Sequence, residues 1–355
     1  MLEELRDFSQ RHVSNHHGLF DPQNFPLDLF LEMGQRKLLD AADPSVVARG
    51  SAIIARESGS LGFAMAWMVN ALVPLVLEKY ASLPAEIKTG LANGTVNIAL
   101  AISESGAGAH PKFLKTSAEQ TAEGWILNGQ KAYITNGPIA SHLAVLAITG
   151  ITGDRKEFSL FLIPISAPGL IQLPHPQFEF LRPAQHCGFA LENCLVSQTA
   201  LLGHPGRAYE EVALPFRNLE DAISVCVMSA ALSHVFHRTA QNLQTHLKDE
   251  ISLQLAELAG IEIALSDISG PILTALEGWE TGMETVELRL IAMRDLIRRV
   301  SKILSRIRTR EDDWIDRILL DIEKTLDIAH SAHQIRQVRL GRKFFTQKNI
   351  NEGSY

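Results

Sequence analysis

The chain has 355 residues, of which 46% are hydrophobic and 21% are charged, and its formal net charge is −7. This length predicts two or three packing units, and the composition excludes an intrinsically disordered chain. The negative charge provides no long-range attraction for nucleic acid or for an anionic membrane, so neither is an expected partner.

The expected elements are helical, then strand-rich, then helical again along the chain. Residues 1–95 contain short amphipathic runs that end at Gly or Pro, which predicts an N-terminal α-helical domain. Residues 96–204 change to short β-rich runs separated by Gly, Pro and Asp, which predicts a middle antiparallel β domain. The helical period returns over residues 205–355 and predicts a C-terminal helical bundle. The expected fold class is therefore α+β.

Residues 58–77 form an uncharged segment that is long enough to cross a lipid bilayer. Because Gly62, Asn70 and Pro74 interrupt it, we expect buried helices of a soluble core and no membrane span. The opening sequence MLEELRDFSQRH has no apolar targeting core, and the three cysteines show no C-x-x-C spacing. Both features favour a cytosolic, that is cytoplasmic, protein in a reducing compartment.

Two apolar stripes in the C-terminal part recur at intervals of three and four residues, which predicts seams between packed helices. Their members are Met293, Ile297, Val300, Leu304 and Ile307, and then Ile315, Ile318, Ile322, Leu326 and Ala329. The other face of the first of these helices is basic, which we interpret as a solvated face, with an acidic partner as the alternative. The basic residues are Arg294, Arg298, Arg299, Lys302 and Arg306.

Four segments carry a resemblance to a known family, and the clearest is GWILNGQKAYITNG at residues 124–137. The others are LANGTVNIALAISESGAGAH at 91–110, FLIPISAPGL at 161–170, and the helical region that follows the strands. In order and spacing they resemble the acyl-CoA dehydrogenase family. The resemblance implies an N-terminal helical domain, a middle antiparallel β domain and a C-terminal four-helix-type bundle.

The resemblance also implies a flavin site on the β domain, with FAD as the cofactor. Thr135 would donate a hydrogen bond toward the N5 and O4 edge of the ring, and Tyr133 stands where the family usually has a stacking Trp. Ser103 stands at the position of the family's Thr, which faces the pyrimidine edge. The remaining cofactor contacts that the resemblance implies come from Ala101, Ile102, Gly108, Ala109 and Ile134.

The Gly-rich loop SGAGAH at residues 105–110 would bring backbone N–H groups close to the pyrophosphate, because glycine permits close approach and positive φ. Here the chain departs from the family, since Ser105, Ala109 and His110 replace the usual Pro, Ser and Asp. One hydroxyl donor to the phosphate is therefore missing. His110 either supplies part of the lost attraction as a cation or is a loop histidine that faces solvent.

The C-terminal region departs further from the family pattern. The R-x-F-G and Q-x-x-G-G-x-G-Y segments, which in the family hold the adenosine end of the neighbouring subunit's FAD, are not visible. The family's reaction needs a carboxylate base that removes the α-proton of the acyl thioester. The usual Glu of the Y-E-G-T segment is not found, because HSAHQIRQVR places His330 near its position.

Some branches of the family place this base on the first long helix of the bundle, where PFRNLEDAISVCVMSAAL carries Glu220 and Asp221. We therefore predict Glu220 as the base. The alternative is that Glu220 and Asp221 form an acidic cap in the first turn of this helix. A further candidate is Glu262, which lies in step with an apolar stripe and is either a partnered buried carboxylate or the edge of an amphipathic helix.

No metal site is expected. His12, His16 and His17 offer ligand spacing on a helix, but the sequence pairs them with no further ligand, so a surface cluster is the favoured interpretation.

The leading function is an FAD-dependent oxidoreductase that forms an α,β double bond in an acyl-CoA or acyl-pantetheine thioester, as in fatty acid metabolism. The resemblance implies that its electrons pass to an electron-transfer flavoprotein. It also implies a homo-oligomer, a homodimer or homotetramer formed through the bundle, with a heteromer as the alternative. Two other functions stay open: a non-catalytic structural subunit of a heteromeric acyl-CoA dehydrogenase, and a flavin-dependent monooxygenase on the same fold.

Overall fold

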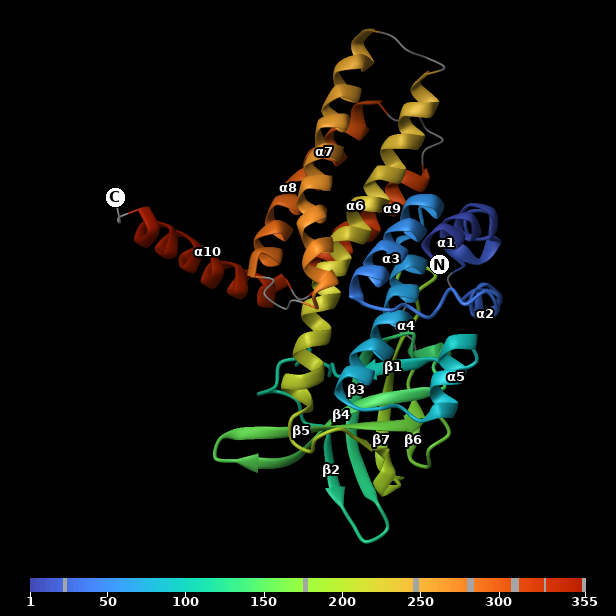
Figure 1. Ribbon diagram of the computed structural model, residues 1–355, viewed down its shortest axis with the longest axis vertical. Helices are drawn as coiled ribbons and strands as arrows, with labels where there is room; N and C mark the ends of the chain where they lie inside the picture. The colour runs from blue at the N-terminus through green and yellow to red at the C-terminus, as the bar shows by residue number, and fades with distance from the viewer. Residues whose placement is uncertain are drawn as a thin grey trace.

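The computed structural model describes residues 1–21, 24–174, 178–244, 249–279, 284–307, 313–328 and 330–352. Helices occupy both ends of the chain and a twisted β-sheet lies between them in sequence, which confirms the expected α+β fold class (Figure 1). The boundaries at residues 95/96 and 204/205 stay a prediction. The N-terminal helices are α1 (Leu2–Phe8), α2 (Leu27–Gln35), α3 (Pro44–Ser58), α4 (Leu61–Tyr80) and α5 (Ala85–Asn93), with short helical turns at Ser9–Val13 and His17–Phe20.

Helix α4 differs from the expectation, because it runs unbroken through Gly62, Asn70 and Pro74. Gly62 lies in the first turn, where an added Cβ would come 2.1 Å from the Leu181 carbonyl oxygen, so this glycine allows a close approach rather than a break. Asn70 is buried, and Pro74 lies inside the helix. Close packing on most sides offsets the poor helix propensity of Gly and Pro.

Three helices of the described chain are long and apolar enough to cross a membrane by length and composition alone. The apolar windows of Leu61–Tyr80 and Tyr209–Gln241 are 78% and 72% buried inside the protein. The window in Leu253–Glu277 is only 22% buried. For the first two, the protein interior accounts for the apolar character.

Within the described residues the sheet has eight strands, and β3 (Trp125–Thr135), β4 (His142–Thr152), β5 (Arg155–Pro164) and β7 (His186–Val196) are the long ones. The sheet is mainly antiparallel, as expected, but β1 (Ile98–Ala101) pairs with β4 in parallel, and Ser117 meets Ile148 of β4 in parallel as well. The intervening hairpin separates these two strands, and such a long connection allows parallel pairing. The short strands are β2 (Ser117–Gln120), β6 (Leu170–Gln172) and β8 (Leu201–Leu202).

Strand β7 was not expected, although it pairs with β3 over most of its length. Its sequence, HCGFALENCLV, contains Gly, Glu and Asn and only one β-branched residue, so its strand signal is weak. Pairing with β3 buries Cys187, Phe189, Leu191 and Cys194, which shows that tertiary packing rather than propensity holds the strand.

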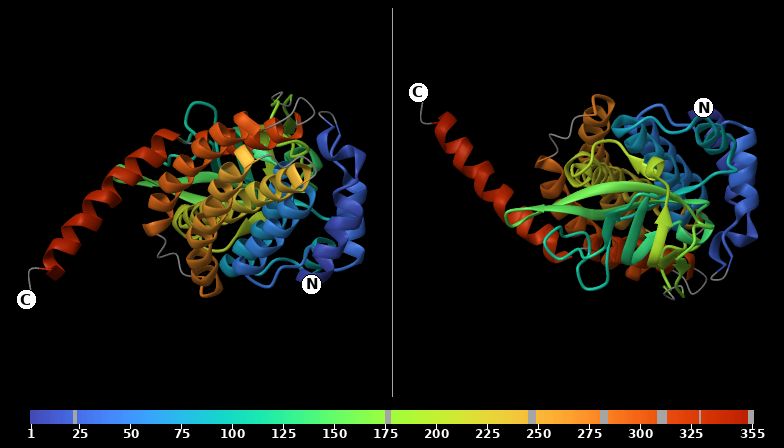
Figure 2. Two further views of the ribbon diagram at one scale, coloured as in Figure 1. Left: turned by 90° about the horizontal axis from the view of Figure 1, so that it is seen from above. Right: turned by 90° about the horizontal axis from the view of Figure 1, so that it is seen from below.

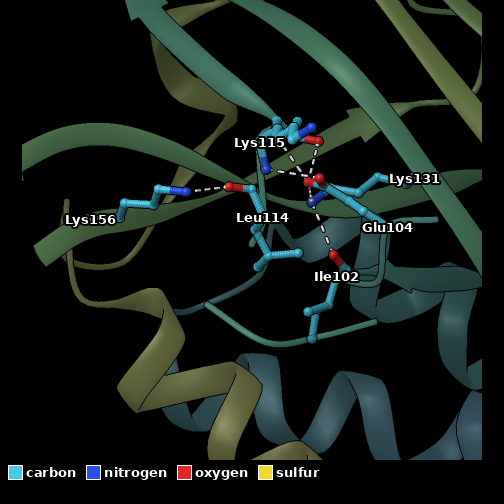
Figure 3. A network of polar contacts seen from close by, with 7 residues as sticks. Ile102, Glu104, Leu114, Lys115, Lys131 and Lys156 are labelled. Atoms are coloured by element: carbon cyan, nitrogen blue, oxygen red, sulfur yellow. Dashed lines mark hydrogen bonds and ion pairs between the residues drawn. The ribbon is translucent and has the colours of Figure 1, made fainter. Parts of the chain in front are cut away.

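A buried ion pair joins the two segments that carry the family resemblance (Figure 3). Lys131 of β3 is 1% exposed, and its Nζ donates to Glu104 Oε1 and to the Ile102 carbonyl oxygen, at 3.0 Å each. Glu104 also accepts from the backbone N–H groups of Lys115 and Thr116 and from the Thr116 hydroxyl. Burial lowers the pKa of Lys131 to about 8, although Glu104 works to raise it.

The C-terminal helices are α6 (Leu214–Gln244), α7 (Asp249–Glu277), α8 (Glu284–Ile307), α9 (Asp313–Asp327) and α10 (His330–Glu352). Both predicted seams are confirmed where side chains are described, since Met293, Ile297, Val300, Leu304, Ile315, Ile318, Ile322 and Leu326 are buried. Ile307 and Ala329 lie outside the described side chains. Helices α6 to α9 pack as a bundle, whereas α10 projects beyond the body (Figures 1 and 2).

Two apolar cores hold these layers together. One lies among the helices and reaches the face of the sheet that they cover, and the other lies within the β domain. All three cysteines, Cys187, Cys194 and Cys226, are free and buried. Burial raises the pKa of Cys187 and of Cys226 to about 12.

The buried ion pair generates a stability prediction. Lys131→Met leaves the Glu104 carboxylate buried without its cation, so the free energy of unfolding falls by roughly 3–5 kcal/mol in urea titrations. Lys115→Met is the matched control, because Lys115 is the exposed lysine of the neighbouring segment, and it leaves the midpoint unchanged. Equal midpoints for the two variants would contradict a structural role for the pair.

Candidate functional site

The ends of β1 and β3 lie side by side and expose two hydroxyl groups. The Ala132 N–H donates to the Ser103 carbonyl oxygen at 2.9 Å, which brings Ser103 beside the last residues of β3. Ser103 and Thr135 are both partly exposed, and neither hydroxyl has a partner within the described part of the chain. Ala101 and Ile134 are buried beneath them. The arrangement presents two free hydroxyl groups to a ligand.

Tyr133 lies on the outside of this edge. Its backbone has φ 60°, and its side chain is 54% exposed, with the ring centroid 6.5 Å from that of Phe178. The carbonyl oxygen of Ile102 is engaged by Lys131. The stacking role predicted for Tyr133 stays a prediction, and the exposed ring is free to take part in it.

Asn136 connects the end of β3 to helix α4. It adopts the left-handed conformation, φ 59°, and its Nδ2 donates to the Ala66 carbonyl oxygen at 2.8 Å. Met65, the residue before Ala66, lines the pocket that also contains Glu220. The predicted cofactor edge and the predicted base therefore lie on either side of one short stretch of α4.

His186 is a site neighbour that sequence reasoning missed. It lies opposite Thr135 in the β3–β7 register, and its ring meets Phe178 edge to face at 5.6 Å. Burial lowers its pKa to about 4, so the imidazole is neutral at physiological pH. No motif marked this residue, because strand β7 itself was not expected.

The glycine loop after Ser103 is open. Gly106 and Gly108 have φ 74° and 54°, and an added Cβ at either would meet nothing within 4 Å. Ala109 is exposed, and its carbonyl oxygen accepts from the Tyr209 hydroxyl at 3.2 Å. His110 is exposed too, with its ring 4.9 Å from that of Phe113. Glycines with free space above them leave room for a group to approach the backbone.

Glu220 lies in a pocket of about 100 Å³ between α4, α6, α8, α9 and the start of α10. Its carboxyl group is partly buried, and within the described residues it makes no hydrogen bond or ion pair. Burial and the neighbouring Asp221 carboxylate raise its pKa to about 8. An unpaired carboxyl group of this kind in a cavity is typical of a group that exchanges a proton.

The alternative interpretation of Glu220 as a first-turn cap is wrong. Helix α6 begins at Leu214 and continues from a π-helical turn at Tyr209–Ala213. Glu220 is thus well inside the helix, beyond the reach of the free N–H groups at its start.

The other candidate carboxylates are engaged. Asp221 Oδ2 accepts from Arg336 Nη2 at 3.2 Å. Glu262 accepts from the Ser233 hydroxyl at 2.8 Å and lies 3.3 Å from His237 Nε2, in a separate cavity of about 470 Å³ between α3, α6 and α7. Glu262 therefore is a partnered carboxylate, as one interpretation required, and it is remote from the cofactor edge.

Arg294 corrects the interpretation of the basic face of α8. Arg298, Arg299, Lys302 and Arg306 are exposed, as expected for a solvated face. Arg294 instead is partly buried, lines the Glu220 pocket and donates to the Leu326 carbonyl oxygen. The apolar seam one residue earlier, at Met293, draws Arg294 to the edge of the helix interface.

The histidines near the N-terminus contact acidic side chains. His16 Nε2 lies 2.8 Å from Asp28 Oδ2, and His12 Nδ1 lies 3.8 Å from Glu32 Oε1. Across the described ranges, no group of three or more His, Cys, Asp or Glu residues could hold a metal ion. The side chain of His330, which the sequence placed near the family's usual base, lies outside the described residues.

Comparisons with known proteins agree with this geometry. The family model for the acyl-CoA dehydrogenase middle domain matches residues 99–194. Isovaleryl-CoA dehydrogenase, mitochondrial, of Solanum tuberosum is 29% identical over 225 residues, which are 58% of this chain and 53% of the relative. The chain thus matches about half the length of such curated relatives.

Solved structures resemble the chain over nearly its whole length. The prolyl acyl carrier protein oxidase AnaB has a TM-score of 0.82 at 17% identity and covers 97% of both chains. The FAD complex of PigA has a TM-score of 0.81 at 16% identity, covering 98% of this chain and 97% of that one. At these identities the likeness shows a shared fold.

The raised pKa of Glu220 predicts how stability depends on pH. The folded protein holds this proton up to about pH 8, whereas the unfolded chain releases it near its ordinary pKa of 4.5, so stability falls as pH rises between these values. Glu220→Gln removes this contribution and raises the free energy of unfolding at pH 8 by a few kcal/mol, roughly. In the Glu220→Gln variant the free energy of unfolding still falls with rising pH, but by less. The remaining fall comes from Asp321, because burial raises its pKa to about 7.

Urea titrations of the cofactor-free protein at pH 5 and pH 8 measure this difference. Glu257→Gln on the exposed surface of α7 is the control and leaves the pH dependence unchanged. A Glu220→Gln variant with the wild-type pH dependence would show that this carboxyl group has an ordinary proton affinity.

Proposed function

We propose that this chain, whose middle domain matches the acyl-CoA dehydrogenase family, is an FAD-dependent dehydrogenase that introduces an α,β double bond into an acyl thioester. The observation that carries the proposal is the unpaired Glu220 carboxyl group in a pocket lined by α4, the helix to which the end of the motif strand is hydrogen bonded. A second pocket within the described residues, between α3, α6 and α7, contains the Glu262 carboxylate, which is paired.

The residues present fit a bound flavin. Ser103 and Thr135 have free hydroxyl groups at one strand edge, and these would meet the polar edge of the ring. Gly106 and Gly108 leave open space that would admit the pyrophosphate against the backbone beside Ala109. The backbone of Ala101, Ile102 and Ile134 forms the floor of this edge. This fit supports FAD as the cofactor. The exposed ring of Tyr133 would cover one face of the flavin.

When bound, FAD would supply the acceptor for the two electrons that leave with the β-hydrogen. The Glu220 carboxylate accepts the α-proton, so the substrate loses two electrons and two hydrogens in total. Glu220 has to be ionised to act, and its surroundings hold it protonated below about pH 8. The lining of the pocket includes the apolar side chains of Met65, Met228 and Leu290.

The small pocket supports a short acyl group. A cavity of about 100 Å³ is small beside the roughly 300–1,000 Å³ of common ligand pockets. We propose that the acyl group is carried as a CoA or protein-bound pantetheine thioester, and AnaB, which has this fold, acts on a prolyl acyl carrier protein. We propose that an electron-transfer flavoprotein is the oxidant. The same proposal includes a homo-oligomer or heteromer that forms through the bundle, and a cytosolic location.

A reduction assay tests the base. Purified protein with bound FAD is mixed anaerobically with a panel of short acyl thioesters, and loss of the visible flavin absorbance is followed. The rate rises with pH and reaches half its maximum near pH 8, because Glu220 must lose its proton. Glu220→Gln retains FAD but slows reduction by about a thousandfold or more, since general base catalysis is lost.

Glu262→Gln is the matched control and reduces at the wild-type rate, because Glu262 lies in the other cavity. Protein that binds FAD but is bleached by no thioester contradicts the dehydrogenase. Protein that never takes up FAD supports the structural-subunit alternative, and oxygen uptake by chemically reduced protein with product hydroxylation supports the monooxygenase.

A glycine pair tests the cofactor loop. Gly108→Ala places a methyl group in the open space of the loop, and we expect FAD affinity to fall by roughly tenfold or more in fluorescence titrations. Gly153→Ala is the matched control, because Gly153 also has positive φ, 60°, and nothing within 4 Å, yet it lies in the β4–β5 turn. Both variants lose similar stability from backbone strain, and equal FAD affinity in the two would remove the loop from the cofactor site.

A further inference from the structure

Glu220 and Asp221 are consecutive carboxyl groups that line the same pocket but differ in their contacts. Glu220 has no partner within the described residues, whereas Asp221 Oδ2 lies 3.2 Å from Arg336 Nη2 and Asp221 Oδ1 lies 3.8 Å from His333 Nε2. Arg336 Nη2 and His333 Nδ1 are themselves 3.0 Å apart. The three residues form a compact polar cluster beside the unpaired carboxyl group.

Both basic members of this cluster come from α10. His333 and Gln337 are its buried polar residues, and Arg336 between them is partly buried. Along the following turns the helix is more exposed, with 57% at Val338 and 67% at Phe345, where it leaves the body of the protein (Figure 2). The contacts to Asp221 therefore lie where α10 is attached to the bundle.

The charge on Asp221 matters for Glu220 because the two carboxyl groups share a pocket with little water. The Asp221 charge raises the pKa of Glu220, as the second cause after burial, because two like charges at close range disfavour the second ionisation. A cation in contact with Asp221 offsets part of this repulsion. Loss of that cation makes a second negative charge on Glu220 harder to form.

The other elements around Glu220 add one further charge. Arg294 of α8 lines the pocket, and α4 and α9 contribute Met65, Thr325, Leu326 and Ile328, none of which titrates. Arg294 donates to the Leu326 carbonyl oxygen, which holds it on the α9 side. The contact that compensates Asp221 is supplied by α10.

We propose that α10 controls how readily Glu220 gives up its proton, by holding the neighbouring Asp221 carboxylate in a cluster with Arg336 and His333. The inference rests on the proposed function, because it takes Glu220 to be the catalytic base. With α10 attached, Arg336 and His333 contact Asp221, and the pKa of Glu220 is lower than it would be without these contacts. With α10 released, Asp221 loses both contacts and Glu220 keeps its proton to higher pH, so less of the base is ionised. Asp221, Arg336 and His333 are positioning residues that act through Glu220.

Two single variants are expected to move the titration of Glu220 in opposite directions. Asp221→Asn removes the like charge, and the midpoint falls by about one pH unit or more. Arg336→Gln removes one of the contacts that α10 makes with Asp221, and the midpoint rises by about one pH unit. In the Asp221→Asn background the same change has a smaller effect, because part of the influence of Arg336 passes through Asp221. Purely structural roles would not produce shifts of opposite sign.

The readout is the carboxyl band of Glu220 in pH-difference infrared spectra of the cofactor-free protein, identified by its loss in Glu220→Gln. Arg339→Gln is the matched control, since it removes the same charge from an exposed position on the same helix, and it leaves the midpoint unchanged. Arg336→Lys keeps the charge and restores most of the wild-type midpoint. Near-ultraviolet circular dichroism shows which variants retain the fold.

Unchanged midpoints in both variants, shifts of the same sign, or an equal shift in Arg339→Gln would overturn the proposal. If Asp221→Asn does not fold, the comparison of Arg336→Gln with Arg336→Lys and Arg339→Gln still decides. The pH midpoint of flavin reduction gives a second readout. Infrared shifts without any reduction by acyl thioesters would leave the inference standing and the proposed function refuted, so the two failures are distinguishable.

Discussion

The buried pair of Lys131 and Glu104 is the constraint on which the candidate site depends. Lys131 sits in the middle of β3, and its two bonds reach the segment that follows β1, at Glu104 and at the Ile102 carbonyl oxygen. Burying an ammonium group is costly, so the pair is stable only while both segments stay in register. That register places Ser103 beside β3. The glycine loop that follows, at residues 105–110, is then left open to solvent.

One side chain, that of Asn136, links the strand that carries Lys131 to a helix that lines the Glu220 pocket. Asn136 ends β3 in a left-handed turn and is hydrogen bonded to α4 at Ala66. Gly62, one turn earlier in α4, packs against the backbone of Leu181, whose N–H is bound by Asp321 of α9 at 2.6 Å. The β domain is thus hydrogen bonded to α4 and packed against α9, two of the helices that line the Glu220 pocket.

Sequence reasoning predicted the order of the layers and the motif strands because both are local patterns. It missed β7, whose weak strand signal is rescued by pairing with β3, and with it His186 opposite Thr135. It left Glu220 undecided between a base and a cap, since the start of α6 depends on the π-helical turn before it. The cluster of Asp221 and Arg336 joins residues 115 positions apart, which no local pattern encodes.

The burial of all three cysteines has a practical consequence for spectroscopy. Cys187 and Cys194 face the core of the β domain and Cys226 faces the helical core, and burial keeps their thiols protonated at ordinary pH. Maleimide and nitroxide reagents react with exposed thiolates, so the folded wild-type chain offers them no target. A single cysteine introduced on the outer turns of α10 would carry the label alone, and distances from that helix to the bundle become measurable without rebuilding the interior.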